Sequence, residues 1–541
     1  MNRPSAWFVI GILAVAVGAS ALRLPRLALR PMHGDEANQA AKAGILFETG
    51  VYRYDPEEHH GPSLYYLTLP SWWLSSARTF AETDEVLFRI VPVVFGIAGI
   101  LLLALVGDGL GRAAAVVAGA LAAISPAMVY FSRYYIQETL LVFFTFAAIA
   151  CGWRYVRGKS VAWAAAAGAA VGLMHATKET WVLAGAAMAA GLALTILWTR
   201  WRDGASPAIR EWLRPRRAGL AAASGAAVVV AAVLFSSFGA NPRGPLDSIL
   251  AYVTYSGRAG GEGLHAHPWY FYLQMLIADR PARGFFWTEG LIVGLALAGA
   301  VAALMRGGLP AGHRPLARFL AFYTIVLTAL YAAIPYKTPW CMLSFLHGMI
   351  LLAGVGAVAI VRLMRLLPLR MAACVVLAAA AVHLGRQSYL LNYRFYADQR
   401  NPLFYAHTST DLLNLAEQME RLARAAPHGR DMMIHVVTPE NYWPLPWYLR
   451  RFNQDHVGYW HDAAAWAADV QRLPPPAVVI LSPDVQPAVD AALKGQYNRQ
   501  SIYGLRPAVL LSVYVRQDIW DAMLAQQASL QDRRGPGGGG P

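Results

Sequence analysis

Residues 6–36 read AWFVIGILAVAVGASALRLPRLALRPMHGDE, so an unbroken apolar run is followed shortly afterwards by an imidazole and two adjacent carboxylates. The apolar part, 6–22, approaches the length of a helix that crosses a bilayer. An ionisable group at the bilayer centre costs about 3 kcal/mol, so membrane proteins keep such groups at the interface or in watered cavities where they act. The stretch therefore predicts a membrane protein whose function involves His33, Asp35 and Glu36.

The composition is that of an integral membrane protein. Hydrophobic residues make up 57% of the chain and charged residues 14%, and the mean hydropathy of +0.37 is too high for an ordinary soluble enzyme. The formal net charge of +14 does not indicate a nucleic-acid partner, because the arginines occupy short loops between apolar runs instead of one basic stripe. The 3 cysteines all lie in apolar runs and form neither a disulfide framework nor a metal motif.

Hydropathy windows of about 19 residues predict about eleven transmembrane helices. The predicted spans are 6–22, 88–106, 113–131, 139–153, 161–176, 181–199, 218–238, 286–305, 318–335, 340–361 and 371–385. Basic residues gather in alternate connections, which places the N-terminus in the cytoplasm by the positive-inside rule. The transmembrane domain is then 1–385, with outer loops at 23–87 and 239–285 and an interfacial helix at 63–76. Ala19-Ser20-Ala21 also resembles a signal-peptide cleavage site, which leaves removal of the first span as an alternative.

After the last span the composition changes, and charged residues and prolines return. Alternating strand-like and helix-like segments over 386–530 predict an extracytoplasmic α/β domain around a parallel sheet. The expected strands are 431–437, 477–481 and 509–515, and the expected helices are 412–425, 463–473 and 485–493. The glycine-rich end, 531–541, predicts a disordered tail. The fold class is thus a mostly α, polytopic membrane protein with a C-terminal α/β domain.

With this topology, polar residues gather on the outer turns of the membrane domain. They are His33, Asp35, Glu36, His59, His60, Arg133, Glu138, Lys178, Glu179 and Lys337. A carboxylate among them could take a proton from an acceptor hydroxyl, which is worth roughly 100- to 10,000-fold in rate. The cations could hold a phosphate through charge-assisted hydrogen bonds. Such a set suits chemistry on a lipid-linked polar substrate.

Several short motifs carry a family resemblance. In chain order they are HGDE (33–36), GPSLYY (61–66), Arg89, SRYYIQET (132–139), TKET (177–180) and YKTPW (336–340). Their order resembles the GT-C glycosyltransferases of the protein O-mannosyltransferase and aminoarabinose-transferase type. Within that superfamily, the combination most resembles a bacterial and archaeal family labelled flippase activity-associated.

The resemblance implies a membrane glycosyltransferase with a polyprenyl-phosphate sugar donor, an acceptor that arrives from outside, and inverting transfer. It implies that Asp35 is the general base, with Glu36 beside it. Arg133, Lys178 and Lys337 are then expected to bind the donor phosphate. His33, His59, His60, Glu138 and Glu179 are expected in supporting places, and the acceptor is a protein, a lipid or a glycan.

Other interpretations of the same residues stay open. Asp35 and Glu36 could simply cap a helix, since acidic residues favour helix N-termini, and the cations could snorkel to lipid headgroups. The histidines could hold a divalent metal with Asp35, although their spacing fits no compact ligand motif. The aromatic run 442–448 could stack on a sugar or pack against protein, and the glycine-containing loop 257–263 could form a lid.

The rival function is a non-catalytic membrane partner or transporter of lipid-linked glycans. A transporter of the inverted-repeat kind would show two similar halves with paired broken helices. The sequence shows no such repeat and no acidic residue deep inside a predicted span. Chemistry is therefore the favoured interpretation.

Overall fold

The computed structural model describes residues 5–57, 60–204, 216–259 and 265–534, and the chain divides into two compact units. The first unit comprises Met1–Leu27, Ile45–Ser75 and Glu85–Tyr405, and the second comprises Ala28–Gly44, Ser76–Asp84 and Ala406–Pro541. The expected domain boundary at 386 therefore differs from the division at 406. The last long helix continues into a π-turn, Leu390–Arg394, and the Asn401 side chain donates to the carbonyls of Leu391 and Phe395 behind it.

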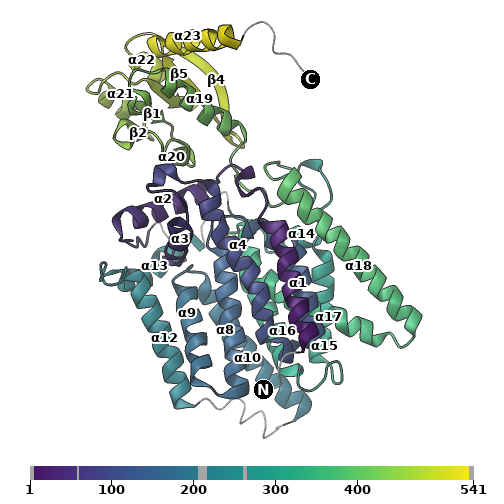
Figure 1. Cartoon of the computed structure of the whole chain (residues 1–541). Helices are drawn as coiled ribbons and strands as arrows, with labels where there is room; N and C mark the ends of the chain where they lie inside the picture. The colour runs from purple at the N-terminus through teal and green to yellow at the C-terminus, as the bar shows by residue number, and fades with distance from the viewer. Residues whose placement is uncertain (1–4, 58–59, 205–215, 260–264, 535–541) are drawn as a thin grey trace. The chain divides into compact units, whose positions relative to one another are not determined.

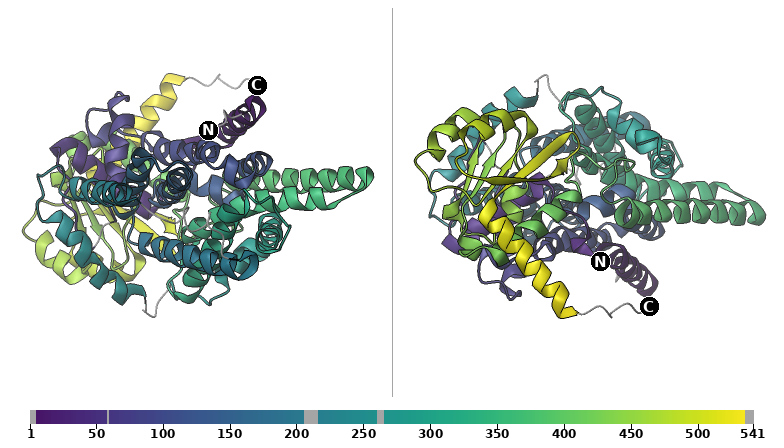
Figure 2. Two further views of the ribbon diagram at one scale, coloured as in Figure 1. Left: turned by 90° about the horizontal axis from the view of Figure 1, so that it is seen from below. Right: turned by 90° about the horizontal axis from the view of Figure 1, so that it is seen from above.

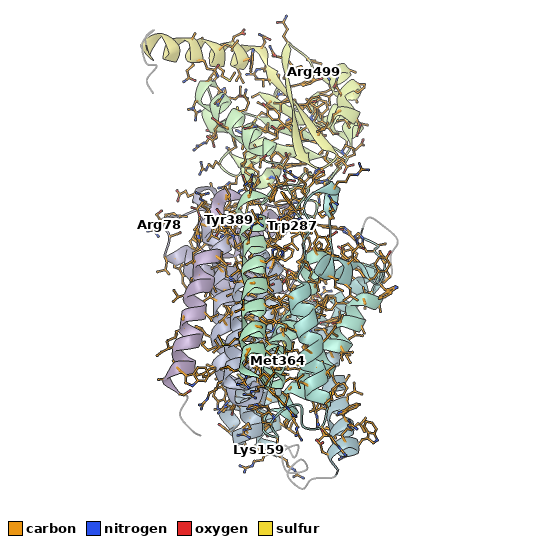
Figure 3. The ribbon with its side chains drawn as sticks, turned by 90° about the vertical axis from the view of Figure 1, so that its right-hand side faces the viewer. Arg78, Lys159, Trp287, Met364, Tyr389 and Arg499 are labelled. Carbon is orange, nitrogen blue, oxygen red and sulfur yellow. The ribbon has the colours of Figure 1, made fainter. Side chains whose placement is uncertain are left out.

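The first unit is a bundle of helices (Figure 1). Its helices are α1 (Ala6–Arg23), α3 (Ser63–Trp73), α4 (Glu85–Leu101), α5 (Gly107–Leu110), α6 (Arg112–Ile124), α7 (Pro126–Ser132), α8 (Glu138–Gly158), α9 (Val161–His175), α10 (Trp181–Asp203), α12 (Arg217–Phe235), α13 (Gly244–Ala259), α14 (Phe271–Ile277), α15 (Gly290–Leu304), α16 (Arg314–Ala333), α17 (Leu343–Leu363) and α18 (Leu367–Tyr389). Another helix, α2 (Gly34–Thr49), begins in the second unit and ends in the first. Trp287 and Tyr389 mark one end of the bundle, and Lys159 and Met364 lie towards the other (Figure 3).

Every predicted span coincides with a helix, but the expected count of eleven transmembrane helices is not confirmed. Among the described residues, 8 helices are long and apolar enough to cross a membrane. The pair α6 and α7, bent by 62°, would make a ninth, and α9 and α15 are apolar but shorter. The bend follows from Pro126, whose ring removes a backbone N–H, and from Arg23, which donates to the freed carbonyls of Ala122 and Ala123.

Glycines let two helix pairs approach closely. A Cβ at Gly168 of α9 would lie 1.9 Å from the Ala223 carbonyl oxygen of α12, and one at Gly299 of α15 would lie 2.0 Å from the Leu352 oxygen of α17. Small residues at such contacts are the usual device for packing helices in lipid. In contrast, α18 leans away from the other helices of the bundle (Figure 2), and only 6% of its most apolar window is buried.

The second unit contains a mixed sheet, with the strand order β2-β1-β3-β5-β4. The strands are β1 (Ile434–Val437), β2 (Val457–Trp460), β3 (Val478–Leu481), β4 (Tyr497–Arg506) and β5 (Val509–Arg516). β1 pairs parallel with β2 and β3, whereas β5 pairs antiparallel with β3 and β4. The prediction of a purely parallel sheet was wrong, because β4 and β5 form a hairpin, and β2 and β4 were not predicted at all.

Helices cover both faces of this sheet. Residues of α19 (Asp411–Ala425) and α23 (Gln517–Arg534) share one core with Ile434 and Val478. On the other face, α21 (Ala463–Val470) and α22 (Gln486–Ala492) pack Trp466 and Val489 against Val437. A short helix, α20 (Leu445–Tyr448), lies within the predicted aromatic run. Because α23 runs to Arg534, the tail expected from 531 is ordered at its start, and its remainder lies outside the described residues.

Candidate functional site

The HGDE segment forms the first turn of α2, and Glu36 caps it. The Glu36 carboxylate is fully buried and accepts the backbone N–H of His33 at 3.1 Å. The Ala37 N–H donates to the His33 carbonyl, which closes the first helical turn. An acidic side chain that reaches back to the N-cap backbone is one half of a capping box. These contacts support the capping interpretation for Glu36 in place of the catalytic one.

Asp35 differs from its neighbour, because half of its side chain (51%) is exposed. The His33 ring accepts the backbone N–H of Asp35 at its Nδ1, at 3.0 Å, and the same nitrogen lies 3.9 Å from an Asp35 carboxylate oxygen. His33 Nδ1 therefore acts as a hydrogen-bond acceptor that fixes this turn. The Asp35 carboxylate is accessible, and the backbone that carries it is fixed.

C-terminal residues of the second unit hold this segment in place. The Met32 N–H donates to the Tyr448 hydroxyl at 3.0 Å, and the Thr408 hydroxyl donates to the Met32 carbonyl at 2.6 Å. The rings of His407 and His33 meet edge to face at 5.0 Å. Trp447, in the predicted aromatic run, contacts Phe80. The run thus packs against protein, and nothing in the sequence pattern pointed to Thr408 or His407 as supports of the HGDE turn.

In the first unit, Lys178 and Glu138 form a buried ion pair. Glu138 begins α8, Lys178 lies in the turn between α9 and α10, and the Lys178 ammonium donates to a Glu138 carboxylate oxygen. Burial alone would lower the pKa of Lys178, but the nearby Glu138 carboxylate raises it above its ordinary value. Lys178 therefore stays charged, and its charge is already neutralised within the protein.

A second pair binds the GPSLYY segment to the same turn. His60 Nδ1 lies 2.8 Å from a Glu179 carboxylate oxygen, and the Ser63 hydroxyl lies 2.7 Å from that of Thr177. Gly61 is required here, because a Cβ at this position would lie 2.3 Å from the Ala176 carbonyl oxygen. Burial, the largest cause, would raise the pKa of Glu179, but His60, a backbone hydrogen bond and Lys178 together hold this pKa below its ordinary value. Two predicted motifs far apart in sequence are thus in contact.

The YKTPW turn lies beside the Lys178–Glu138 pair. The Cys341 thiol interacts electrostatically with both Lys178 and Glu138, and it lies 3.2 Å from the Thr338 hydroxyl. Tyr331 of α16 also interacts with Lys178. Neither Cys341 nor Tyr331 could be picked out from the sequence, because each lies in an apolar helical pattern typical of ordinary core.

Lys337 is buried, at 1% exposure, and unlike Lys178 it has no carboxylate partner in the part of the chain that the structure describes. Its ammonium donates to the Ile334 carbonyl, and its backbone N–H donates to the His265 carbonyl at 2.9 Å. Among the described residues no carboxylate pairs with it, and burial lowers its pKa. A buried cation that lacks a neutralising partner is a candidate for holding an anion.

The Arg133 side chain is held by contacts within the protein. Its guanidinium donates to the carbonyls of Arg23, Pro25 and Arg26 at the end of α1, and to the Tyr393 hydroxyl at 3.0 Å. These carbonyl and hydroxyl oxygens occupy the guanidinium N–H groups that a phosphate would need as donors. Arg133 therefore ties α1 to the α7 turn, and its contacts do not support the predicted donor-phosphate role.

Two other expectations concern residues that the structure does not describe or describes only in part. His59 and most of the 257–263 loop lie outside the described residues. Within the described part of the chain, no three His, Cys, Asp or Glu side chains lie close enough to hold a metal ion. The roles expected of these residues stay predictions.

A family model and solved structures of other proteins match this chain and identify its fold. The family model for dolichyl-phosphate-mannose-protein mannosyltransferase matches residues 63–233. The structure of ArnT from Cupriavidus metallidurans bound to undecaprenyl phosphate superposes with a TM-score of 0.63 at 15% identity, over 94% of this chain and 98% of ArnT. The chain has the GT-C glycosyltransferase fold. The apo oligosaccharyltransferase of Archaeoglobus fulgidus, also of this GT-C fold, matches with a TM-score of 0.54 at 13% identity, over 92% of this chain and 74% of its own.

The GT-C fold confirms the prediction of a mostly α, polytopic membrane protein. GT-C proteins are polytopic membrane proteins, so this chain is a multi-pass membrane protein. No curated protein matches the chain. The finer resemblance to the flippase activity-associated GT-C family stays a prediction.

Proposed function

We propose that this GT-C protein is an inverting glycosyltransferase that moves a sugar from a polyprenyl phosphate to an acceptor outside the cytoplasmic membrane. The observation that carries the proposal is the state of Asp35, a half-exposed carboxylate on a fixed backbone, beside a fully buried Glu36. ArnT, which shares the fold over nearly its whole length, is described with undecaprenyl phosphate bound. A lipid-phosphate donor is consistent with that likeness.

In the proposed reaction Asp35 takes the proton from the acceptor hydroxyl. The acceptor oxygen then attacks the anomeric carbon of the sugar from the face opposite the phosphate. The bond between the anomeric carbon and the phosphate oxygen breaks, and polyprenyl phosphate leaves with the electron pair. General-base assistance of this kind is worth roughly 100- to 10,000-fold in rate.

Lys337 is the residue that we assign to the donor phosphate. Its buried ammonium has no carboxylate partner among the described residues, so a phosphate would supply the missing counter-charge through charge-assisted hydrogen bonds. Lys178 already has Glu138 and Arg133 already has three carbonyls. We therefore reduce the predicted set of phosphate ligands to Lys337, and give Lys178 a positioning role in the neighbouring turn.

The orientation in the membrane is part of the proposal. Basic residues such as Arg306, Arg314 and Arg362 lie in connections that the positive-inside rule places in the cytoplasm. The HGDE turn, the TKET turn and the second unit would then lie on the outer side. The acceptor, whether protein, lipid or glycan, would meet the enzyme there.

The test uses the purified full chain in lipid vesicles. A panel of radiolabelled polyprenyl-phosphate sugars is offered with candidate acceptors, and transferred sugar is measured separately from donor binding. The proposal expects transfer with at least one donor, and a parallel assay with chelator decides whether a divalent cation takes part. Tight binding of donors with no transfer of any sugar to any acceptor would favour the non-catalytic partner.

A further inference from the structure

A cavity of about 420 Å³ lies in the first unit, at the end of the bundle where α16 begins. Its lining residues are Leu110, Gly111, Ala113, Ala114, Gly307, Gly308, Leu309, Pro310, His313, Val355, Val358, Ala359, Arg362 and Leu363. Lys337 follows the other end of α16. A helix of 20 residues is about 30 Å long at 1.5 Å per residue. The cavity is therefore remote from the residue that we assign to the donor phosphate.

One side of this cavity is cationic. Arg362 is exposed and His313 is half-buried. Burial is the larger cause that lowers the pKa of His313, and the nearby Arg362 charge lowers this pKa further. Among the described residues that line the cavity, none is acidic. Asp108 interacts with His313, but the Asp108 carboxylate is already held by Arg154 at 3.0 Å. The positive charge at the cavity is thus not neutralised by its lining.

Most of the remaining lining is apolar. Val355, Val358 and Ala359 of α17 form its wall. Just beyond them, Leu363 is 75% exposed and Leu366 is 64% exposed. These apolar side chains lie on the same helix as Arg362, so they can contact a hydrocarbon chain whose anionic head pairs with that arginine.

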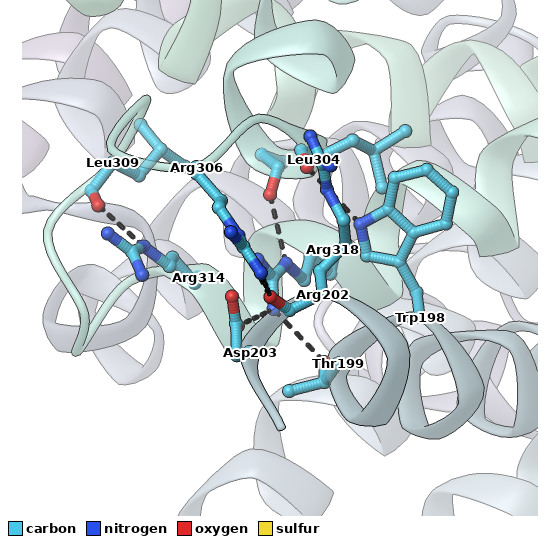
Figure 4. Close-up of polar contacts among 10 residues, drawn as sticks. Trp198, Thr199, Arg202, Asp203, Leu304, Arg306, Leu309, Arg314 and Arg318 are labelled. Carbon is cyan, nitrogen blue, oxygen red and sulfur yellow. Dashed lines mark hydrogen bonds and ion pairs between the residues drawn. The ribbon is translucent and has the colours of Figure 1, made fainter.

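Hydrogen bonds fix the rim of the cavity before any ligand binds. Arg314 donates to the Leu309 carbonyl at 2.8 Å, and Arg306 donates to the Arg202 carbonyl. Figure 4 shows these contacts together with Arg318, which donates to the carbonyl of Ala303 at 3.1 Å and also pairs with Asp203. The loop between α15 and α16 is therefore held in shape by the side chains of Arg306, Arg314 and Arg318.

Two of the glycines that line the cavity cannot be replaced by a larger residue without strain. A Cβ at Gly308 would lie 2.2 Å from the Ala302 carbonyl oxygen, so no larger residue fits there. Gly111 has a φ of +93°, and a Cβ at this position would approach the His313 ring at 3.2 Å. The backbone at both positions depends on glycine for its conformation or its close contact.

We propose that this cavity binds the phosphate headgroup of an anionic phospholipid, with one acyl chain along α17. The volume of about 420 Å³ lies within the range of roughly 300–1,000 Å³ that is typical of small-ligand pockets. With the orientation proposed above, the cavity opens to the cytoplasmic leaflet, where anionic lipids create a negative surface potential. The charge and the apolar wall together select a ligand that has both an anionic head and a hydrocarbon chain.

Native mass spectrometry of the delipidated full chain tests this directly, in the absence of any sugar donor. The probes are dioleoylphosphatidylglycerol, dioleoylphosphatidylcholine, glycerol 3-phosphate and inorganic phosphate. Arg362→Gln removes the exposed cation, with Arg365→Gln in the connection between α17 and α18 as its matched control. Ala359→Phe fills the cavity, with Val376→Phe on the exposed face of α18 as its control.

We expect the native chain to bind phosphatidylglycerol in preference to phosphatidylcholine. Both Arg362→Gln and Ala359→Phe should raise its Kd by about tenfold, the equivalent of one charge-assisted hydrogen bond, whereas neither control should change it. Equal binding of the neutral lipid, or unchanged binding by Ala359→Phe, would overturn the proposal. Binding of glycerol 3-phosphate or phosphate as tightly as the lipid would also overturn it, since the apolar wall would then play no part.

Discussion

The Lys178 ammonium donates to the Glu138 carboxylate, so the cation of the TKET turn is neutralised by the first residue of α8. Both side chains are buried, and the pair joins segments that are 40 residues apart in sequence. Breaking a buried pair leaves one uncompensated charge, which costs about 3–5 kcal/mol. In the proposed assignment, Lys178 therefore positions the TKET turn and Lys337 binds the donor phosphate.

The first prediction concerns this pair. Glu138→Gln and Lys178→Met should each destabilise the protein strongly, and the double variant should be less affected than the sum of the two. Thermal unfolding of the purified variants, arranged as a double-mutant cycle, measures the coupling. Glu417→Gln, which breaks the exposed pair with Arg421, should cost less than about 1 kcal/mol. Additive losses from Glu138 and Lys178 would show that the two side chains do not interact.

The second prediction separates Lys337 from Lys178. Lys337→Met removes a buried cation that has no carboxylate partner in the described part of the chain, so the protein should keep or gain stability. Its affinity for the polyprenyl-phosphate donor should fall by about tenfold or more, since one charge-assisted hydrogen bond is worth about 1.5–3 kcal/mol. Donor binding is measured by titration, with Lys159→Met as the control. Unchanged donor affinity would remove Lys337 from the proposed phosphate site.

The third prediction tests the contact between two motifs. Gly61→Ala places a methyl group 2.3 Å from the Ala176 carbonyl oxygen, so the GPSLYY segment must move away from the TKET turn. We expect a loss of stability and of sugar transfer together. Gly152→Ala in α8 is the matched control, because nothing lies within 4 Å of its new Cβ and alanine favours a helix by about 1 kcal/mol. A wild-type melting temperature for Gly61→Ala would contradict the observed contact.

Much of the membrane half follows from local pattern. Each of the eleven apolar stretches is a helix in the structure, because apolar length alone marks a helix that lies in lipid. Whether each one spans the membrane is not decided by that pattern, since α6 and α7 bend at Pro126 and α9 and α15 are short. The strands β2 and β4 were missed because neither is a continuous apolar run: β2, with the sequence VGYW, contains a glycine, and β4, with the sequence YNRQSIYGLR, is largely polar.

The candidate residues themselves came from the sequence, but their roles depend on contacts between distant segments. Asp35 and Glu36 are neighbours, and only the turn of α2 decides that Glu36 points inward. Arg133 looks like a free outer cation until its three carbonyl partners at the end of α1 are known. The attachment of Ala28–Gly44 to the second unit joins parts of the chain almost 400 residues apart, which no local pattern encodes.

The fourth prediction concerns acid stability of the second unit. His435 is buried in β1, accepts the Trp466 indole N–H at 3.0 Å, and burial lowers its pKa to about 4. Because the folded-state pKa lies below the unfolded value of about 6.5, the unfolded state binds more protons between these values, and stability falls as the pH drops through this window. The expected loss is about 3 kcal/mol at 1.36 kcal/mol per pKa unit.

Hydrogen exchange of the β1 and β3 amides in the full chain, corrected for intrinsic rates, measures this loss. Protection should decrease from pH 6.5 to pH 4 in the native chain. The decrease should be smaller in His435→Gln, which cannot titrate. Protection that stays constant over this range would show that His435 does not remain neutral in the folded protein.

The most direct test of the account compares Asp35→Asn with Glu36→Gln in the sugar-transfer assay, at equal donor binding. If Asp35 is the base and Glu36 the cap, Asp35→Asn loses transfer by at least about 100-fold while its melting temperature is unchanged. Glu36→Gln loses stability by about 0.5–2 kcal/mol and keeps most of its transfer at a temperature where it is folded. Asp484→Asn, on the exposed surface of the same unit, should behave as wild type. Full transfer by Asp35→Asn would contradict the assignment of the general base.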